Sequence, residues 1–217
     1  MYDLDGTLVD SVPDLAIAID DMLTDLDLPK AGEEKTRLWV GNGVPSMVKR
    51  ALANDIKGDQ PGAVDETLFQ TALARFSLHY EREVGLHSQL YQGVETFLQA
   101  MSDKGVKQAV VTNKTACFTE KLLEMMHINQ HFELRLGGDS LTEKKPHPMP
   151  LQHTMNHFGV SKQASLMVGD SINDIKAARA AGITVIGLPY GYNHGEPIES
   201  ANPDLVVSSL ADLLQHL

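Results

Sequence analysis

The chain has 217 residues, a formal net charge of −11 and an apolar fraction of 42%, which allows one medium-sized domain or a core domain with a smaller insert. The negative charge argues against general binding to nucleic acids or anionic membranes, and no apolar run approaches the ~20 residues of a membrane-spanning helix. Cys117 is the single cysteine, so no intrachain disulfide can form, and we expect a cytoplasmic protein.

The chain opens with the segment Asp3-Leu4-Asp5-Gly6-Thr7. Residues i and i+2 of a strand point to the same face, so Asp3 and Asp5 are expected to converge at a strand end, where Gly6 permits a sharp turn. Two adjacent carboxylates repel unless a proton or a cation lies between them. The pair therefore indicates a divalent metal beside a reacting phosphate. A strand that carries Asp3 needs about three or four earlier residues, so we expect further residues before Met1.

The stretch from residue 12 to residue 90 is predicted to be helical. Helices are expected over 14–26, 44–53 and 66–83, with a polar link over 55–62. Apolar side chains recur on one face of the first helix, namely Leu15, Ile19, Met22, Leu23 and Leu26. This stretch lacks strand–helix alternation. We therefore interpret 12–90 as a helical cap domain inserted into a core domain that comprises 1–11 and 91–217.

Helix and strand patterns alternate from Val94 onward. Helices are predicted over 94–105, 118–126, 150–158, 172–181 and 209–216, and strands over 108–112, 132–136, 165–168, 183–187 and 205–207. Such alternation predicts an α/β fold with a doubly wound parallel sheet, a Rossmann-like hydrolase core. Ligands in such sheets bind at the carboxyl ends of the strands.

Polar motifs follow three further predicted strands. These motifs are Thr112-Asn113, Lys144-Lys145-Pro146, and Asp170-Ser171-Ile172-Asn173-Asp174. Each has an ordinary interpretation: a turn for the first, a solvated loop for the second and a helix N-cap for the third. These ordinary interpretations would all have to hold at once at four strand ends, and we reject them jointly.

In this order, the four motifs resemble those of the haloacid dehalogenase superfamily of aspartate-nucleophile phosphatases. The helical insert after the first motif resembles the all-helical cap of that superfamily, and the resemblance covers essentially the whole chain. It implies a magnesium-dependent phosphatase that acts through an aspartyl-phosphate intermediate.

The resemblance implies a role for each motif residue. Asp3 is expected to be the nucleophile, and Asp5 the general acid and base. Mg²⁺ would bind to the Asp3 carboxylate, the Asp5 backbone carbonyl and Asp170. Phosphate oxygens would be bound by Thr112, Asn113 and Lys145, while Asp174 would support the metal site and orient the lysine.

The choice between two adjacent lysines depends on the proline that follows them. In the superfamily the lysine directly precedes the proline, so Lys145 is preferred over Lys144. The proline restricts Lys145 to an extended backbone. We also predict that the Lys145–Pro146 peptide bond is cis, although only ~5–6% of such bonds are.

Within the superfamily, the chain most resembles the bacterial phosphoglycolate phosphatases. The residues that carry this likeness are 39–44 in the cap, and 137–139, 144–148 and 190–193 in the core. Phosphoglycolate carries a carboxylate besides its phosphate, and backbone N–H groups of Gly41, Asn42 and Gly43 at a helix start could bind an anion. The expected partner is a small phosphorylated metabolite, with no nucleic acid or membrane, and the protein is expected to be a monomer or a homodimer.

Several alternatives stay open at this stage. A phosphatase for sugar phosphates, pyrophosphate or nucleotides would keep every core residue and differ only in the cap. A phosphomutase acting on sugar phosphates would return the phosphoryl group to its substrate. A dehalogenase is disfavoured because it leaves Asp5 without a role. A phospho-receiver module, the non-enzyme alternative, also combines acidic residues with a threonine and a lysine, but needs no helical insert.

Overall fold

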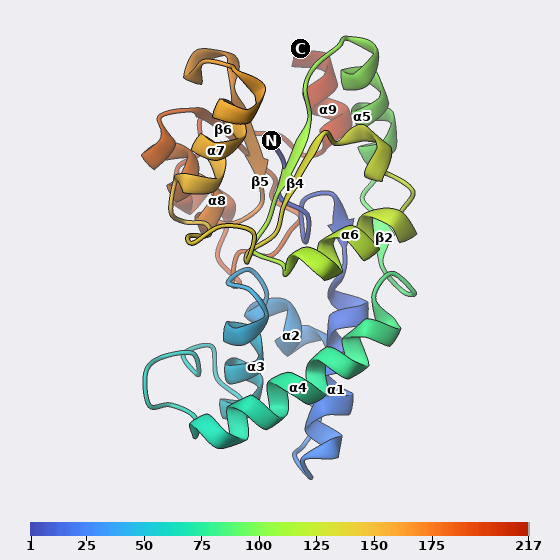
Figure 1. The fold of residues 1–217 in the computed structure, drawn as a ribbon, viewed down its shortest axis with the longest axis vertical. Coiled ribbons are helices and arrows are strands. Elements are labelled where there is room, and N and C mark those ends of the chain that lie inside the picture. Colours follow the sequence, from blue (N-terminus) through green and yellow to red (C-terminus); the bar gives the residue numbers. More distant parts are fainter. Residues whose placement is uncertain (217) are drawn as a thin grey trace.

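The computed structural model describes residues 1–216 and consists of a sheet-containing part joined to a cluster of helices (Figure 1). The sheet-containing part holds a parallel sheet whose strands lie in the order β4–β3–β5–β6–β7, with the backbone of Tyr2 between β3 and β5. The strands are β3 (Ala109–Val111), β4 (Leu134–Leu136), β5 (Leu166–Gly169), β6 (Thr184–Gly187) and β7 (Leu205–Val206). The predicted doubly wound α/β core is confirmed.

The first segment of the chain occupies the centre of this sheet. The Tyr2 N–H donates to Ala109 O, and the Asp3 N–H donates to Val168 O, over 2.9 and 3.0 Å. Tyr2 forms isolated parallel bridges to Val110 and Val168, so the expected first strand is present as a short bridged segment. Asp3 thus follows directly after backbone that is held on both sides.

Alternate residues of the central strands pack on opposite faces of the sheet. Val110 and Val168 pack with Phe97 of helix α5, whereas Val111 and Met167 belong to a second apolar cluster. The helices of the sheet-containing part are α5 (Val94–Asp103), α6 (Ala116–Met125), α7 (Met149–Phe158), α8 (Ile172–Ala181) and α9 (Leu210–Leu213). Because both faces are covered, polar side chains can reach one another only at the strand ends.

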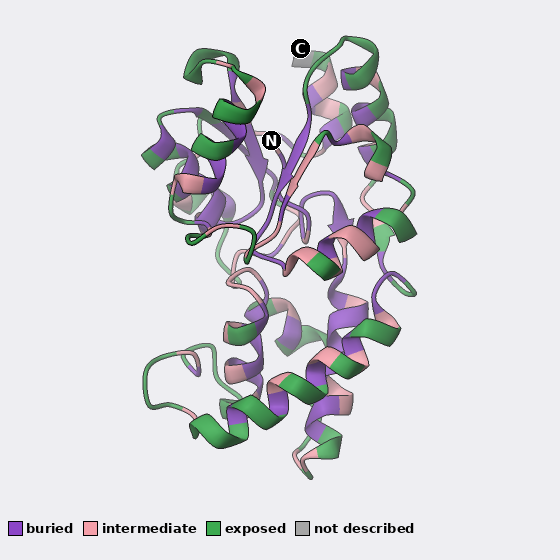
Figure 2. Ribbon diagram, in the orientation of Figure 1, coloured by how far each residue is buried: buried purple, intermediate pink, exposed green. Residues whose placement is uncertain are grey.

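Four helices form the second cluster, drawn below the sheet in Figure 1. They are α1 (Val12–Asp25), α2 (Gly32–Trp39), α3 (Val44–Ala53) and α4 (Glu66–Glu83). Helices α3 and α4 begin and end where the sequence predicted. Helix α2 was not predicted, because its sequence is largely charged and only Thr36 and Trp39 are buried. Figure 2 shows that α4 buries one side along the cluster and exposes the other.

The chain enters and leaves the helical cluster through a short antiparallel strand pair. Strand β1 (Val9–Asp10) pairs with β2 (Gln89–Leu90), with Val9 opposite Leu90. Strand β2 belongs to the predicted cap segment 12–90, but its pairing partner is β1 and not a part of the helical cluster. The boundaries 12 and 90 of the cap stay a prediction. Among residues 1–216, no helix has the length and apolar character that crossing a membrane would require.

Candidate active site

Three carboxylates from different parts of the chain meet at the carboxyl ends of the strands. Ligand oxygens of Asp3, Asp170 and Asp174 all lie within 4.8 Å of one another, and all three residues are buried. Asp3 follows the bridged segment, Asp170 follows β5, and Asp174 lies in the first turn of α8. The sequence analysis placed Asp3 and Asp170 at a metal and Asp174 in support of it, and the structure brings all three together.

Because the three carboxylates are buried close together, their negative charges repel strongly unless a cation lies near them. Burial raises the pKa of Asp3 to about 6, with Lys145 acting in the opposite sense. Burial also raises the pKa of Asp170 well above its usual range, and the neighbouring charges of Asp3 and Asp174 add to the effect. Oxygen ligands from carboxylates are those that Mg²⁺ prefers. The donor set therefore fits a hard divalent cation.

Asp170 is held in place by several close contacts. Its oxygens accept hydrogen bonds from Thr7 Oγ1 and from the Tyr192 N–H. A Cβ atom on Gly6 or on Gly191 would lie 2.2 Å from Asp170 Oδ2, so both positions require glycine. Sequence analysis did not assign Thr7 or Tyr192, because nothing local to either residue indicates its distant partner.

Lys145 is the buried cation of the cluster. Its Nζ lies 2.6 Å from Asp174 Oδ1 and 3.0 Å from Asp3 Oδ2. Burial opposes the charge, but Asp174 and Asp3 together hold the pKa of Lys145 above its usual value. The Lys145–Pro146 peptide bond is cis, as predicted. Lys144 instead donates to Asn42 O over 2.7 Å, so only Lys145 of the two adjacent lysines reaches Asp3.

The N-cap interpretation of the third motif, rejected in the sequence analysis, holds for Ser171, and Asp174 takes part in it. Ser171 is the N-cap of α8, and its hydroxyl and backbone N–H donate to Asp174 Oδ2 in a capping box. The other oxygen, Oδ1, accepts from Lys145 Nζ. The helix cap and the orientation of the lysine are therefore parts of one arrangement.

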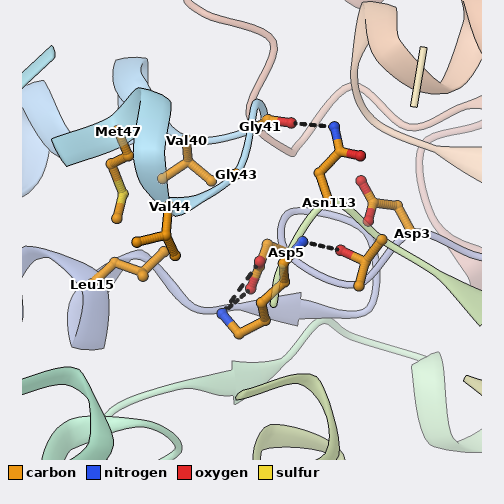
Figure 3. A pocket seen from close by; sticks show the side chains of 11 residues that line it. Asp3, Asp5, Leu15, Val40, Gly41, Gly43, Val44, Met47 and Asn113 are labelled. Carbon is orange, nitrogen blue, oxygen red and sulfur yellow. Dashed lines mark hydrogen bonds and ion pairs between the residues drawn. The ribbon is translucent and has the colours of Figure 1, made fainter. Parts of the chain in front are cut away.

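The Asp5 side chain lies outside the acidic cluster. Its Oδ1 accepts from Ser11 Oγ over 2.5 Å and from Lys114 Nζ over 3.0 Å. Asp3 and Asp5 nevertheless line the same cavity (Figure 3), as the i and i+2 spacing predicted. Lys114 was missed by the sequence analysis, although it directly follows the predicted phosphate-binding pair Thr112-Asn113.

The pair at the end of β3 lies between the acidic cluster and the helical cluster. Asn113 Nδ2 donates to Gly41 O over 3.0 Å (Figure 3). It also donates to Lys145 O over 2.9 Å. Its buried Oδ1 has no hydrogen-bond partner among the described residues. Thr112 Oγ1 accepts from the Lys114 N–H. Both residues line the cavity with Asp3 and Asp5.

The helical cluster closes the cavity with apolar side chains. These are Leu15 of α1 and Val40, Val44 and Met47 in and before α3 (Figure 3). Gly41 and Gly43 also line the cavity. Asn42, between them, is not among the residues that line the cavity, and its backbone carbonyl accepts a hydrogen bond from Lys144 Nζ. A binding role of residues 41–43 stays a prediction.

Comparison with known proteins agrees with this geometry. The family model of the haloacid dehalogenase-like hydrolases matches residues 1–188. The chain is 46% identical over 213 residues to a phosphoglycolate phosphatase of Nitrosococcus oceani, covering 98% of this chain and 93% of that protein. It is 47% identical over 214 residues to one of Pseudomonas putida, covering 99% and 77%.

A solved structure extends the comparison to the fold. The crystal structure of a predicted phosphoglycolate phosphatase from Haemophilus somnus superimposes with a TM-score of 0.92, at 40% identity, covering 99% of this chain and 95% of that one. The resemblance that the four motifs indicated is thereby confirmed. The chain belongs to the haloacid dehalogenase-like hydrolase family.

Proposed function

We propose that this protein is a Mg²⁺-dependent phosphatase that hydrolyses 2-phosphoglycolate to glycolate and phosphate through an aspartyl-phosphate on Asp3. The observation that carries the proposal is the position of Asp3. Its carboxylate lies 3.0 Å from the Lys145 ammonium and within 4.8 Å of an oxygen of Asp170, and it lines a cavity together with Asp5. A nucleophile and a proton donor thus border one space, and a buried cation contacts the nucleophile.

In the first step, a carboxylate oxygen of Asp3 attacks phosphorus and the bond to the ester oxygen breaks. Asp5 gives its proton to that leaving oxygen. In the second step, water attacks the phosphorus of the aspartyl-phosphate while Asp5 accepts a proton from it, which releases phosphate and the free Asp3 carboxylate. Ser11 and Lys114 hold the Asp5 side chain toward the cavity through both steps.

Other side chains stabilise the charge on the phosphate. Lys145 supplies a fixed positive charge, and Thr112 and Asn113 supply hydrogen bonds. Asp3, Asp170 and the Asp5 backbone carbonyl would hold Mg²⁺. Bound there, the ion would offset the negative charge of the carboxylates and of the phosphate oxygens.

The substrate class follows from the cavity and the relatives. Leu15, Val44 and Met47 form an apolar wall of the cavity that Asp5 also lines, and this enclosure supports a small leaving group. The relatives that match nearly the whole chain are named phosphoglycolate phosphatases. A cytoplasmic location and a monomeric or homodimeric state stay predictions.

A panel of phosphate esters tests the proposal. The purified protein with Mg²⁺ is assayed for phosphate release from phosphoglycolate, glucose 6-phosphate, a nucleoside monophosphate and pyrophosphate. We expect kcat/KM to be highest for phosphoglycolate and to vanish on chelation of the metal. A higher kcat/KM for another ester would contradict the substrate assignment while leaving the phosphatase chemistry in place.

The phosphomutase alternative has its own readout. A mutase returns the phosphoryl group to a sugar, so phosphate release from a sugar bisphosphate would be slow relative to isomerisation. We expect phosphate release with no isomerised sugar. Isomerisation without phosphate release would contradict hydrolysis as the reaction.

A further inference from the structure

We propose that Lys114 binds the carboxylate of the substrate and thereby sets the preference for an anionic leaving group. The inference rests on the proposed function and assigns a specificity-determining residue at the same site. Lys114 is a buried, charged residue at the cavity, and the reaction proposed above gives it no role in binding the substrate.

Lys114 is the one residue with a cationic side chain among the described residues that line the cavity. It is 4% exposed, and its Nζ lies 3.0 Å from Asp5 Oδ1. Lys145 is on the other side of the site, where it contacts Asp3 and Asp174. We therefore assign the two buried lysines to different parts of a bound ester: Lys145 binds the phosphoryl group, and Lys114 binds the leaving group.

The distances place a small carboxylate within reach of Lys114. Asp5 approaches the ester oxygen of the substrate to hydrogen-bond distance, ~2.7 Å, when it donates its proton. In phosphoglycolate a single methylene group separates that oxygen from the carboxylate carbon. A group bonded so close to the ester oxygen lies beside the Asp5 side chain, and hence beside the ammonium that contacts it.

Lys114 is held in a fixed position at the edge of the cavity. Its ammonium group contacts both carboxylate oxygens of Asp5, over 3.0 and 3.3 Å, and Tyr80 Oη, over 2.6 Å. Tyr80 of helix α4 is itself held between Phe76, stacked at 5.3 Å, and Phe118, edge-on at 4.9 Å. The longer contact, to Asp5 Oδ2 at 3.3 Å, is the one that a substrate carboxylate in the cavity would replace.

In the part of the chain that the structure describes, the helical cluster offers the cavity no charged or polar side chain. Leu15, Val44 and Met47 are apolar, so a carboxylate bound against them would be desolvated without compensation. Thr112 and Asn113 are assigned to the phosphoryl group, which leaves Lys114 to bind the carboxylate of a charged ester, and an uncharged leaving group gains nothing from the lysine.

Paired substrates separate this role from support of Asp5. We compare kcat/KM for phosphoglycolate and for ethyl phosphate, which lacks the carboxylate, in the wild type, K114M and K121M. Lys121 is the matched control because its Nζ, like that of Lys114, contacts helix α4, at Glu81 O, whereas Lys121 does not line the cavity. We expect K114M to lower the ratio of the two values by about 10–100-fold, and K121M to leave the ratio within about 2-fold of the wild type.

The outcomes are distinguishable. If K114M lowers kcat/KM for both esters equally, Lys114 acts only through Asp5 and the assignment is overturned while the proposed function stands. If the wild type does not prefer phosphoglycolate to ethyl phosphate, the proposed function fails and the assignment falls with it. If thermal melting shows that K114M is unfolded, K114Q replaces it: the amide keeps a polar side chain beside Asp5 and Tyr80 but carries no charge, and an unchanged ratio overturns the assignment.

Discussion

At the scale of single residues, the site depends on how closely backbone approaches Asp170. Gly6, with φ of +86°, and Gly191 both leave no room for a side chain beside the Asp170 carboxylate. Thr7 Oγ1 and the Tyr192 N–H then hold its two oxygens. The orientation of this carboxylate therefore results from two separate loops and not from the β5 strand alone.

We predict that Gly6→Ala disrupts this arrangement. The new Cβ would lie 2.2 Å from Asp170 Oδ2, so we expect a loss of about 10–100-fold in Mg²⁺ affinity or activity. Gly62→Ala is the control, since Gly62 has a similar φ of +80° and nothing within 4 Å. Steady-state rates at varied Mg²⁺ measure the effect. Equal losses in the two variants would show that backbone strain, and not contact with Asp170, is responsible.

Asp3 and Asp5 should respond differently to the same substitution. Asp3→Asn removes the nucleophile, and we expect turnover to fall by about 10³-fold or more with the fold retained. Asp5→Asn should slow both chemical steps but leave Mg²⁺ binding largely intact, because the proposed metal contact is a backbone oxygen. Calorimetric titration with Mg²⁺ and single-turnover rates measure the two effects. Near-normal turnover by Asp3→Asn would exclude the covalent mechanism.

At the scale of elements, helix α1 is tied to the segment that returns from the helical cluster. Asp14, which is fully buried in the first turn of α1, accepts hydrogen bonds from the Gly85 and His87 N–H groups over 2.8 and 2.7 Å, and from Ser88 Oγ. These donors lie between α4 and β2. One carboxylate therefore holds together the outgoing and the returning connections of the helical cluster.

We predict that Asp14→Ala destabilises the protein by about 3 kcal/mol, because three buried donors lose a charged acceptor at once. Asp103→Ala is the control: Asp103 is exposed and accepts only from Gln99 among the described residues, and we expect a change below about 0.5 kcal/mol. Urea unfolding measures both values. A loss for Asp14→Ala as small as that of the control would mean that water replaces the carboxylate without cost.

At the scale of the whole molecule, an anionic protein must bind an anionic substrate. The net charge is −11, yet the site holds two buried lysines, Lys114 beside Asp5 and Lys145 beside Asp3. Each is paired with a carboxylate that takes part in the proposed reaction. The cationic groups that would attract a phosphate thus lie inside the site. Acidic groups elsewhere on the protein have little influence there, because salt screens exposed charges over longer distances.

This charge arrangement predicts how pH changes the effect of Mg²⁺ on stability. Burial raises the pKa of Asp3 to about 6 and that of Asp170 well above the usual range. The stability that these protonated groups contribute to the metal-free protein is present below about pH 4 and is lost as the pH rises through about 6. We therefore expect added Mg²⁺ to raise Tm more at pH 8 than at pH 5.

Thermal melting with and without Mg²⁺ at the two pH values measures this difference. Asp170→Asn is the control, because it removes one of the repelling charges, and we expect it to reduce the difference. A rise in Tm that is the same at both pH values would contradict a metal bound by these carboxylates.

The sequence was sufficient for most elements of the core and for the positions of its polar motifs. Helix α8 and helices α3 and α4 lie where the apolar periodicity placed them, because each has a clear apolar face and a recognisable end. Helix α2 was missed because it is mostly charged. Thr112 and Asp170 were proposed because they directly follow predicted strands, which is local information, and Lys145 because it precedes Pro146 as the superfamily motif does.

The contacts between these motifs required the tertiary structure. Lys114 lies 109 residues from Asp5, and Tyr192 lies 22 residues from Asp170, and no local pattern connects either pair. By itself, the sequence determined the fold class and brought forward Asp3, Asp5, Lys145 and Asp170 as candidate site residues, since these depend on periodicity, on position at strand ends and on the resemblance of the motifs. Only the packing of the helical cluster against the sheet decided which lysine contacts which carboxylate, because those side chains come from segments that approach each other only after folding.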